Sequence, residues 1–175
     1  MHCFFFLSFD SVKISYYRLC DMLPPPIEDG DIRGFDVEKN AKKRCSALDR
    51  KFELTDKYIE YKGVRLYRIR AVISFGKVHV GDLGGFVESE YNLSHFGLSW
   101  IAEEAKVFSC AVISGNAQVS GHAQVCENSI VAGESSVMDH VLVFGNSKVD
   151  EKAIVRGNVW ISGNAHVCGH SVVED

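Results

Sequence analysis

The 175-residue sequence has no CxxC pair, no excess of basic residues and no long apolar run. Its cysteines stand at positions 3, 20, 45, 110, 126 and 168 without metal-finger spacing, so we expect free thiols in a reducing compartment. A net charge of -4 and a pI near 6.0 argue against a general binder of nucleic acid or anionic membranes, because a mildly acidic surface attracts neither.

The apolar run that begins at Cys3 ends by Asp10, which is too short to span a bilayer. It also lacks the preceding basic residues and the small-residue cleavage site of a signal peptide. We therefore expect a cytoplasmic protein that contacts neither a membrane nor nucleic acid.

What the sequence does contain is an uninterrupted repeat of six residues. From Ser99 onward an aliphatic residue occupies every sixth position: Ile101, Val107, Ile113, Val119, Val125, Val131, Val137, Val143, Val149, Val155, Ile161, Val167 and Val173. A small residue stands two positions earlier, except where Val141 and Val159 take that place. A turn dipeptide such as Gly115-Asn116 often precedes it. This pattern is the hexapeptide signature of a parallel β-helix.

The repeat predicts an all-β fold in which three hexads form one triangular coil of eighteen residues. Coils stack at the interstrand spacing of about 4.8 Å with the aliphatic residues inside. Glycine and asparagine suit the corners, because both tolerate the left-handed backbone angles that sharp turns need. About four coils fit between residues 99 and 175, and each depends on its neighbours for burial of its apolar side chains.

The residues before the repeat divide into two parts. Residues 1–50 are predicted to be a linker or partly disordered, with Pro24-Pro25-Pro26 as a stiff extended break. Residues 51–98 are rich in β-formers and are expected to cover the open end of the first coil as an N-terminal cap.

Within this expected cap, a hairpin is predicted around Lys62-Gly63, and a short strand at Val78–Val80. Three glycines between Gly81 and Gly85 indicate a sharp change of chain direction. The same glycine run near Arg65, Arg68 and Arg70 also suggests a phosphate-binding loop, but no helix start follows it to supply the amides. A structural turn is favoured, and the arginines form either a solvated face or an anion site.

The chain resembles the YdcK-like acetyltransferase group of hexapeptide-repeat proteins from bacteria and phages. The resemblance covers residues 64–173 and is carried by the run RIRAVISFGKVHVGDLGGFVESEYNLSHFGLSW, in which Gly81–Phe86 and Asn92-Leu93 lead into Trp100. It implies a left-handed β-helix of the transferase hexapeptide class. For an active enzyme it also implies a trimer with acetyl-CoA bound between subunits. Since fold does not fix function, the activity rests on the resemblance alone.

Two histidines are the weak catalytic candidates. His122 and His140 lie one coil apart and should share a corner column with Glu104 and Asn158, where they could serve as a metal site or a general base. Asparagine fills the equivalent turn position elsewhere, which favours a structural role. His166 is expected on an outward strand position and His170 in another corner. Neither has a predicted carboxylate to orient it, so both are expected on the surface, and no metal site is predicted.

The eighteen-residue spacing predicts further columns of stacked side chains. Asn128, Asn146 and Asn164 should stack above Cys110 as a ladder of side-chain hydrogen bonds. An apolar stripe on one flat side should consist of two neighbouring columns, one with Phe108, Cys126 and Phe144 and the other with Leu142 and Trp160. An exposed apolar surface of this size is typical of an interface, so we expect a homo-oligomer, a trimer by analogy with the class. The alternative is that the first fifty residues cover this side.

These observations leave two main functional readings open. The first is a self-associating β-helix scaffold or binding module with no cofactor. The second is an acyltransferase that uses acetyl-CoA, although no loop between Ser99 and Asp175 interrupts the hexads to carry a catalytic base. A weaker third reading is the binding of a small metabolite or nucleotide between subunits without chemistry.

Overall fold

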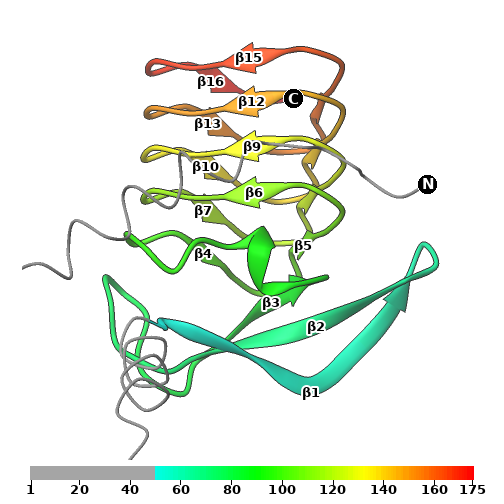
Figure 1. Cartoon of the computed structure of the whole chain (residues 1–175). Helices are drawn as coiled ribbons and strands as arrows, with labels where there is room; N and C mark the ends of the chain where they lie inside the picture. The colour runs from blue at the N-terminus through cyan, green and yellow to red at the C-terminus, as the bar shows by residue number, and fades with distance from the viewer. Residues whose placement is uncertain (1–49) are drawn as a thin grey trace, which may run out of the picture. The chain divides into compact units, whose positions relative to one another are not determined.

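The computed structural model describes residues 50–175, which form a stack of short parallel strands with a long antiparallel hairpin at its first-coil end (Figure 1). The hairpin and first coil contain β1 (Phe52–Tyr61), β2 (Val64–Ala71), β3 (Leu83–Val87), the 3-10 turn η2 (Glu90–Asn92) and β4 (Trp100–Ile101). The remaining strands are two residues long: β5 (Lys106–Val107), β6 (Val112–Ile113), β7 (Gln118–Val119), β8 (Gln124–Val125), β9 (Ile130–Val131), β10 (Ser136–Val137), β11 (Leu142–Val143), β12 (Lys148–Val149), β13 (Ile154–Val155), β14 (Trp160–Ile161), β15 (His166–Val167) and β16 (Val172–Val173).

The strands form three sheets, one on each side of the coil. Their orders are β1-β2-β3-β5-β8-β11-β14, β16-β13-β10-β7-β4 and β15-β12-β9-β6. From β4 onward each strand residue pairs in parallel with the residue eighteen positions later, as Leu142 does with Trp160 and Lys148 with His166. The predicted all-β parallel β-helix with three hexads per coil is therefore confirmed.

The stack has about five coils, because it begins before the first uninterrupted hexad. Val87 pairs with Val107, and Leu93 forms a bridge to Ile113, so both lie one coil below the repeat that starts near Ser99. From Leu93 to Ile101 the inward positions are eight residues apart instead of six. Because of these two extra residues, the first coil does not continue the six-residue period of the later coils.

The core is the column of aliphatic residues that the repeat predicts. Eleven of the thirteen are buried, and Val167 and Val173 on the last coil are half-buried. The small residues two positions earlier stand where the chain turns. The hydroxyl of Ser129 donates a hydrogen bond to the carbonyl of Cys126 at 2.6 Å, and that of Ser147 to the carbonyl of Phe144 at 2.7 Å. A serine therefore fills a corner and also satisfies one of its carbonyl groups.

Each corner contains a residue with a positive φ angle, and this residue is acidic at four corners. From Glu103 onward glycine supplies this conformation at seven corners and Ser109 at one, and the acidic residues at the other four are Glu103, Glu127, Asp139 and Glu151, with φ between 56° and 62°. Each acidic side chain accepts a hydrogen bond from the backbone N–H of a glycine one coil later: Gly121, Gly145, Gly157 and Gly169. The acid thus offsets its own unfavourable conformation with a bond to the next coil.

The predicted asparagine ladder is present in a neighbouring corner column. The side-chain amide of Asn128 donates to the Oδ1 of Asn146 at 3.1 Å, and the amide of Asn146 donates to the Oδ1 of Asn164 at 3.3 Å. These bonds link three successive coils through the same side-chain type.

The predicted hairpin is confirmed, with Lys62 and Gly63 both at positive φ between β1 and β2. Its outer end packs over the sheet that contains β5 and β8. The hydroxyl of Tyr61 donates to the Oε1 of Gln124 at 2.7 Å, and the ring of Tyr61 meets the ring of Phe108 edge-on. Sequence reading did not place the hairpin on this side.

Of two expectations for the segment between β2 and β3, one is wrong and the other is only partly confirmed. Val78–Val80 is not a strand: Val78 makes a single bridge with Phe75, because the chain turns back within three residues and leaves no partner to extend the pairing. The expected change of direction is present at Gly81, which lies in a turn with a φ of 93°, but Gly84 and Gly85 lie inside β3. A Cβ on Gly84 would lie 2.5 Å from the carbonyl oxygen of Ile101, so glycine is needed there for close packing against the first coil.

The predictions for residues 1–49, including the break at Pro24-Pro25-Pro26, lie outside the described residues. In the described range, no helix is long and apolar enough to span a membrane.

Candidate functional site

The corner histidines His122 and His140 stack on each other as the eighteen-residue spacing predicts. Their ring centroids are 5.1 Å apart and their planes differ by 9°. Both side chains are exposed, and within residues 50–175 neither ring is hydrogen-bonded to a carboxylate. Glu104, which shares this column, is instead paired with Arg68 at 2.7 Å. The column therefore has no group that would orient a histidine as a base.

The three arginines of β2 do not form an anion site. Arg65 contacts Glu60 at 3.1 Å, and the Nε of Arg70 donates to Glu53 at 2.9 Å, while Arg68 is paired as described above. Each guanidinium group already faces a carboxylate. The arginines are therefore part of an ion-paired surface, which is the simpler of the two interpretations that the sequence allowed.

A different histidine does have a carboxylate partner. The Nε2 of His166 lies 2.9 Å from the Oδ1 of Asp150, and the other carboxylate oxygen of Asp150 lies 2.5 Å from the ammonium group of Lys148. The expectation that His166 has no carboxylate to orient it is therefore wrong. Asp150 directly follows β12, and His166 begins the neighbouring strand β15, so two residues sixteen positions apart in the sequence meet on one sheet.

Cys168 completes this cluster. Its sulfur, one nitrogen of His166 and one oxygen of Asp150 all lie within 4.8 Å of one another. The side chain of Asp150 is only 15% exposed, whereas that of His166 is half exposed. Hydrogen bonds from Lys148 and then from His166 hold the pKa of Asp150 below its ordinary value, so this carboxyl group is ionised at neutral pH.

Sequence reading missed this cluster because its signal is spread over one coil. His166 and Cys168 are two residues apart on a strand, and Asp150 stands eighteen residues before Cys168. The repeat predicts that residues eighteen positions apart are neighbours on adjacent coils, which places Asp150 beside Cys168. Because side chains two residues apart on a strand point to the same face, His166 lies on that face as well. A search of the outer faces for metal-binding or acid-base residue types would have found it.

The predicted apolar stripe is partly buried within the chain. Phe108 and Cys126 are 6% and 7% exposed, because Leu66 and Phe86 form a second hydrophobic cluster with them beneath the hairpin. This burial raises the pKa of the Cys126 thiol above its ordinary value. These two residues are therefore not available for an interface between subunits.

The other residues of the predicted apolar stripe are accessible to different degrees. Leu142 and Phe144 are half-buried at the edge of the same cluster. Trp160, which pairs with Leu142 on the next coil, is 73% exposed. We call Leu142, Phe144 and Trp160 the apolar surface below.

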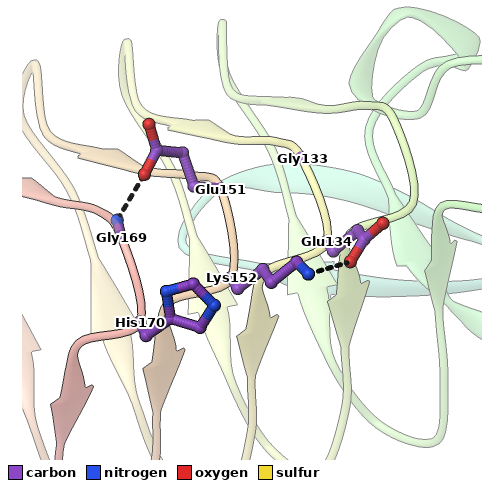
Figure 2. A pocket seen from close by; sticks show the side chains of 6 residues that line it. All are labelled: Gly133, Glu134, Glu151, Lys152, Gly169 and His170. Atoms are coloured by element: carbon purple, nitrogen blue, oxygen red, sulfur yellow. Dashed lines mark hydrogen bonds and ion pairs between the residues drawn. The ribbon is translucent and has the colours of Figure 1, made fainter.

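A shallow cavity of about 350 Å³ lies along another corner (Figure 2). It is lined by polar and charged residues from three coils, among them Glu134, Lys152 and His170. Lys152 faces Glu134 at 3.7 Å, and Glu151 accepts the backbone N–H of Gly169 at 2.7 Å. His170 is exposed as predicted. Since its acidic groups already have partners, we assign no ligand to this cavity.

No protein-family model matches this sequence, and no curated protein matches it either.

Proposed function

We propose that this chain is a non-catalytic β-helix scaffold that associates with copies of itself through the apolar surface. The observation that carries the proposal is the exposure of Trp160 beside Leu142 on a flat sheet. Trp160 pairs with the half-buried Leu142, and with Phe144 these side chains form an apolar patch of the kind that is typical of interfaces. By its resemblance to hexapeptide-repeat proteins, the chain is expected to be a left-handed helix and to form a trimer.

The partial cover by the hairpin explains why the apolar surface is confined to the later coils. The hairpin tip reaches Gln124 on β8, and the apolar residues on β11 and β14 lie beyond it. Burial of one tryptophan and parts of two other side chains would contribute on the order of 5 kcal/mol per subunit before the cost of association. That gain is sufficient for a weak or moderate interface but is not a measure of affinity.

Sedimentation or light scattering of the full chain tests this proposal. The parent is expected to be a trimer, and Phe144→Asp with Trp160→Ser is expected to give a folded monomer. Ile130→Ser is the matched control, because Ile130 is an exposed aliphatic on a different sheet. It should keep the parent mass. A monomeric parent, or a double variant of unchanged mass, would refute the proposal.

One observation favours the acyltransferase as a second candidate. Asp150 is hydrogen-bonded to the Nε2 of His166, which can hold the proton on that nitrogen and leave Nδ1 free as a base. In acyl transfer, Nδ1 would take the proton of an acceptor amine or hydroxyl as the acceptor attacks the thioester carbonyl of acetyl-CoA. The carbon–sulfur bond would then break and CoA would leave as a thiolate.

Release of free CoA from acetyl-CoA, measured with a panel of amine and hydroxyl acceptors, separates the two candidates. The scaffold predicts no release above the background rate. The acyltransferase predicts release that is lost in His166→Gln and kept in both His122→Asn and His140→Asn. Release that disappears in either corner variant would instead make the corner column the active site.

A further inference from the structure

The register between β12 and β15 brings four polar side chains together on one face. Lys148 lies beside His166, and Val149 pairs with Val167, so Asp150 lies beside Cys168 one position further along. Neighbouring strands are about 4.8 Å apart, and alternate residues of a strand point to the same face. Asp150, His166 and Cys168 therefore lie at three corners of a small rectangle, with Lys148 at the fourth.

The three donor atoms are close enough for a single ion to bind them together. They all lie within 4.8 Å of one another, and His166 Nε2 and Asp150 Oδ1 are 2.9 Å apart. Tetrahedral zinc with bonds of about 2.0–2.3 Å holds its ligand atoms roughly 3.3–3.8 Å apart. Side-chain movements of about 1 Å, without any change in the backbone, would convert one arrangement into the other.

The chemistry of the donors selects among cations. Thiolate and imidazole are ligands for zinc and similar transition metals, whereas magnesium and calcium prefer sets made only of oxygen. Three protein ligands also leave the fourth position of a tetrahedral ion for water or another molecule. Because the cluster lies on an outer face, that position would be open to solvent.

Lys148 is compatible with a metal ion at this place. Its ammonium group holds the Oδ2 of Asp150, which leaves Oδ1 on the side of His166. Carboxylates that bind metals commonly have such a hydrogen-bonded partner, which fixes their orientation. Lys148 is thus a positioning residue and does not occupy the space between the three donors.

We propose that Asp150, His166 and Cys168 form a binding site for one zinc ion, or a similar divalent transition-metal ion, on the outer face of the last two coils. On binding, the metal replaces the thiol proton of Cys168, which is released to solvent, and takes the place of the hydrogen bond between His166 and Asp150. This site shares no residue with the apolar surface, so the metal site and the proposed self-association can be tested independently of each other.

Titration of zinc chloride and cobalt chloride into the metal-free full chain tests the proposal. Calorimetry is expected to show one zinc ion per chain. Cobalt is expected to give a thiolate-to-metal charge-transfer band in the near ultraviolet. Cys168→Ala should remove that band and weaken zinc binding at least tenfold, and Asp150→Asn and His166→Gln should weaken it by a similar factor. Zinc should also raise the melting temperature of the parent and not that of Cys168→Ala.

Two matched controls assign the signal to this cluster. Cys110→Ala removes another exposed thiol, and His170→Gln removes an exposed imidazole of the same coil that does not belong to the cluster. Both should keep the band and the parent affinity. A parent that binds no metal, or a band that persists in Cys168→Ala, would overturn the assignment, and circular dichroism of each variant excludes loss of folding as the cause.

Discussion

The ammonium group of Lys51 donates a hydrogen bond of 2.7 Å to the carbonyl oxygen of Ser99, a residue forty-eight positions later. It also donates to the hydroxyl of Ser99 at 2.9 Å, and its side chain is almost completely buried. The residue just before β1 is thereby tied to a corner of the first coil. Within residues 50–175 its hydrogen bonds go to carbonyl and hydroxyl oxygens and to no carboxylate, so the burial of this cation has a consequence for stability.

Lys51→Met is expected to change how stability depends on pH. Burial lowers the pKa of Lys51 from 10.5 to about 8, so the unfolded chain binds more protons than the folded chain between these values. The free energy of unfolding contributed by Lys51 therefore rises as pH increases from 8 to 10.5, by about 1–3 kcal/mol.

Urea unfolding of the parent and of Lys51→Met, at several pH values and one protein concentration, measures this difference. Subtraction of the methionine variant removes the effects of other groups, such as Cys126, whose raised pKa acts in the opposite direction. A difference between the two proteins that is the same at pH 7 and pH 10 would contradict the expected titration of Lys51.

Gly145→Ala is expected to destabilise the fold far more than Gly163→Ala. Both glycines have positive φ, at 79° and 67°. A Cβ on Gly145 would lie 2.8 Å from the backbone nitrogen of Gly163, whereas a Cβ on Gly163 would meet nothing within 4 Å. We expect a loss of about 1 kcal/mol for Gly163→Ala and at least about 3 kcal/mol for Gly145→Ala in thermal or urea unfolding. Equal losses would show that the close approach of successive corners is unimportant.

Glu127→Ala is expected to lower stability by about 1 kcal/mol, because it removes the acceptor for the N–H of Gly145 at 2.9 Å. Glu127→Gln keeps a side-chain oxygen in place and should lose less. Glu134→Ala is the control, since Glu134 is an exposed corner residue whose side chain has only a long ion pair with Lys152. If Glu127→Ala and Glu134→Ala lose the same amount in urea unfolding, the corner acids have no special role.

Tyr61→Phe is expected to lower stability by about 1 kcal/mol through loss of its 2.7 Å hydrogen bond to Gln124. Tyr58→Phe should have a smaller effect, because Tyr58 is half exposed and its ring contacts other hairpin residues. Limited proteolysis adds a second measurement: cleavage near Lys62 should be faster in Tyr61→Phe. A Tyr61 variant indistinguishable from the parent would mean that the hairpin does not dock through its tip.

The core could be predicted from the sequence because one residue type repeats at one spacing. Val131 and its equivalents are buried at the positions that the six-residue period predicts. The asparagine ladder follows because three such periods make one coil of eighteen residues. The first coil could not be found in this way, since Leu93 and Ile101 are separated by eight residues. Irregular spacing in a single coil leaves no periodic signal.

The outer surface was less predictable for a different reason. A buried position accepts only a few residue types, whereas an outward position accepts many, so the Asp150, His166 and Cys168 cluster has no repeat of its own. The acidic corners were missed because glycine and asparagine are the residues expected at positive φ, and an acid becomes favourable there only through the glycine of the next coil. Cover of Phe108 by the hairpin depends on a long-range docking that local patterns do not encode.

The eighteen-residue pairing of the stack also restricts how such a chain can change its length during evolution. Loss or gain of six residues keeps every aliphatic inside, but rotates all later residues by one side of the triangle. A six-residue deletion between Asp150 and His166 would therefore keep the aliphatic core packed, but would place His166 and Cys168 on a different face from Asp150. Only insertions or deletions of whole coils preserve both the interior and the pairs of residues that meet on the outside.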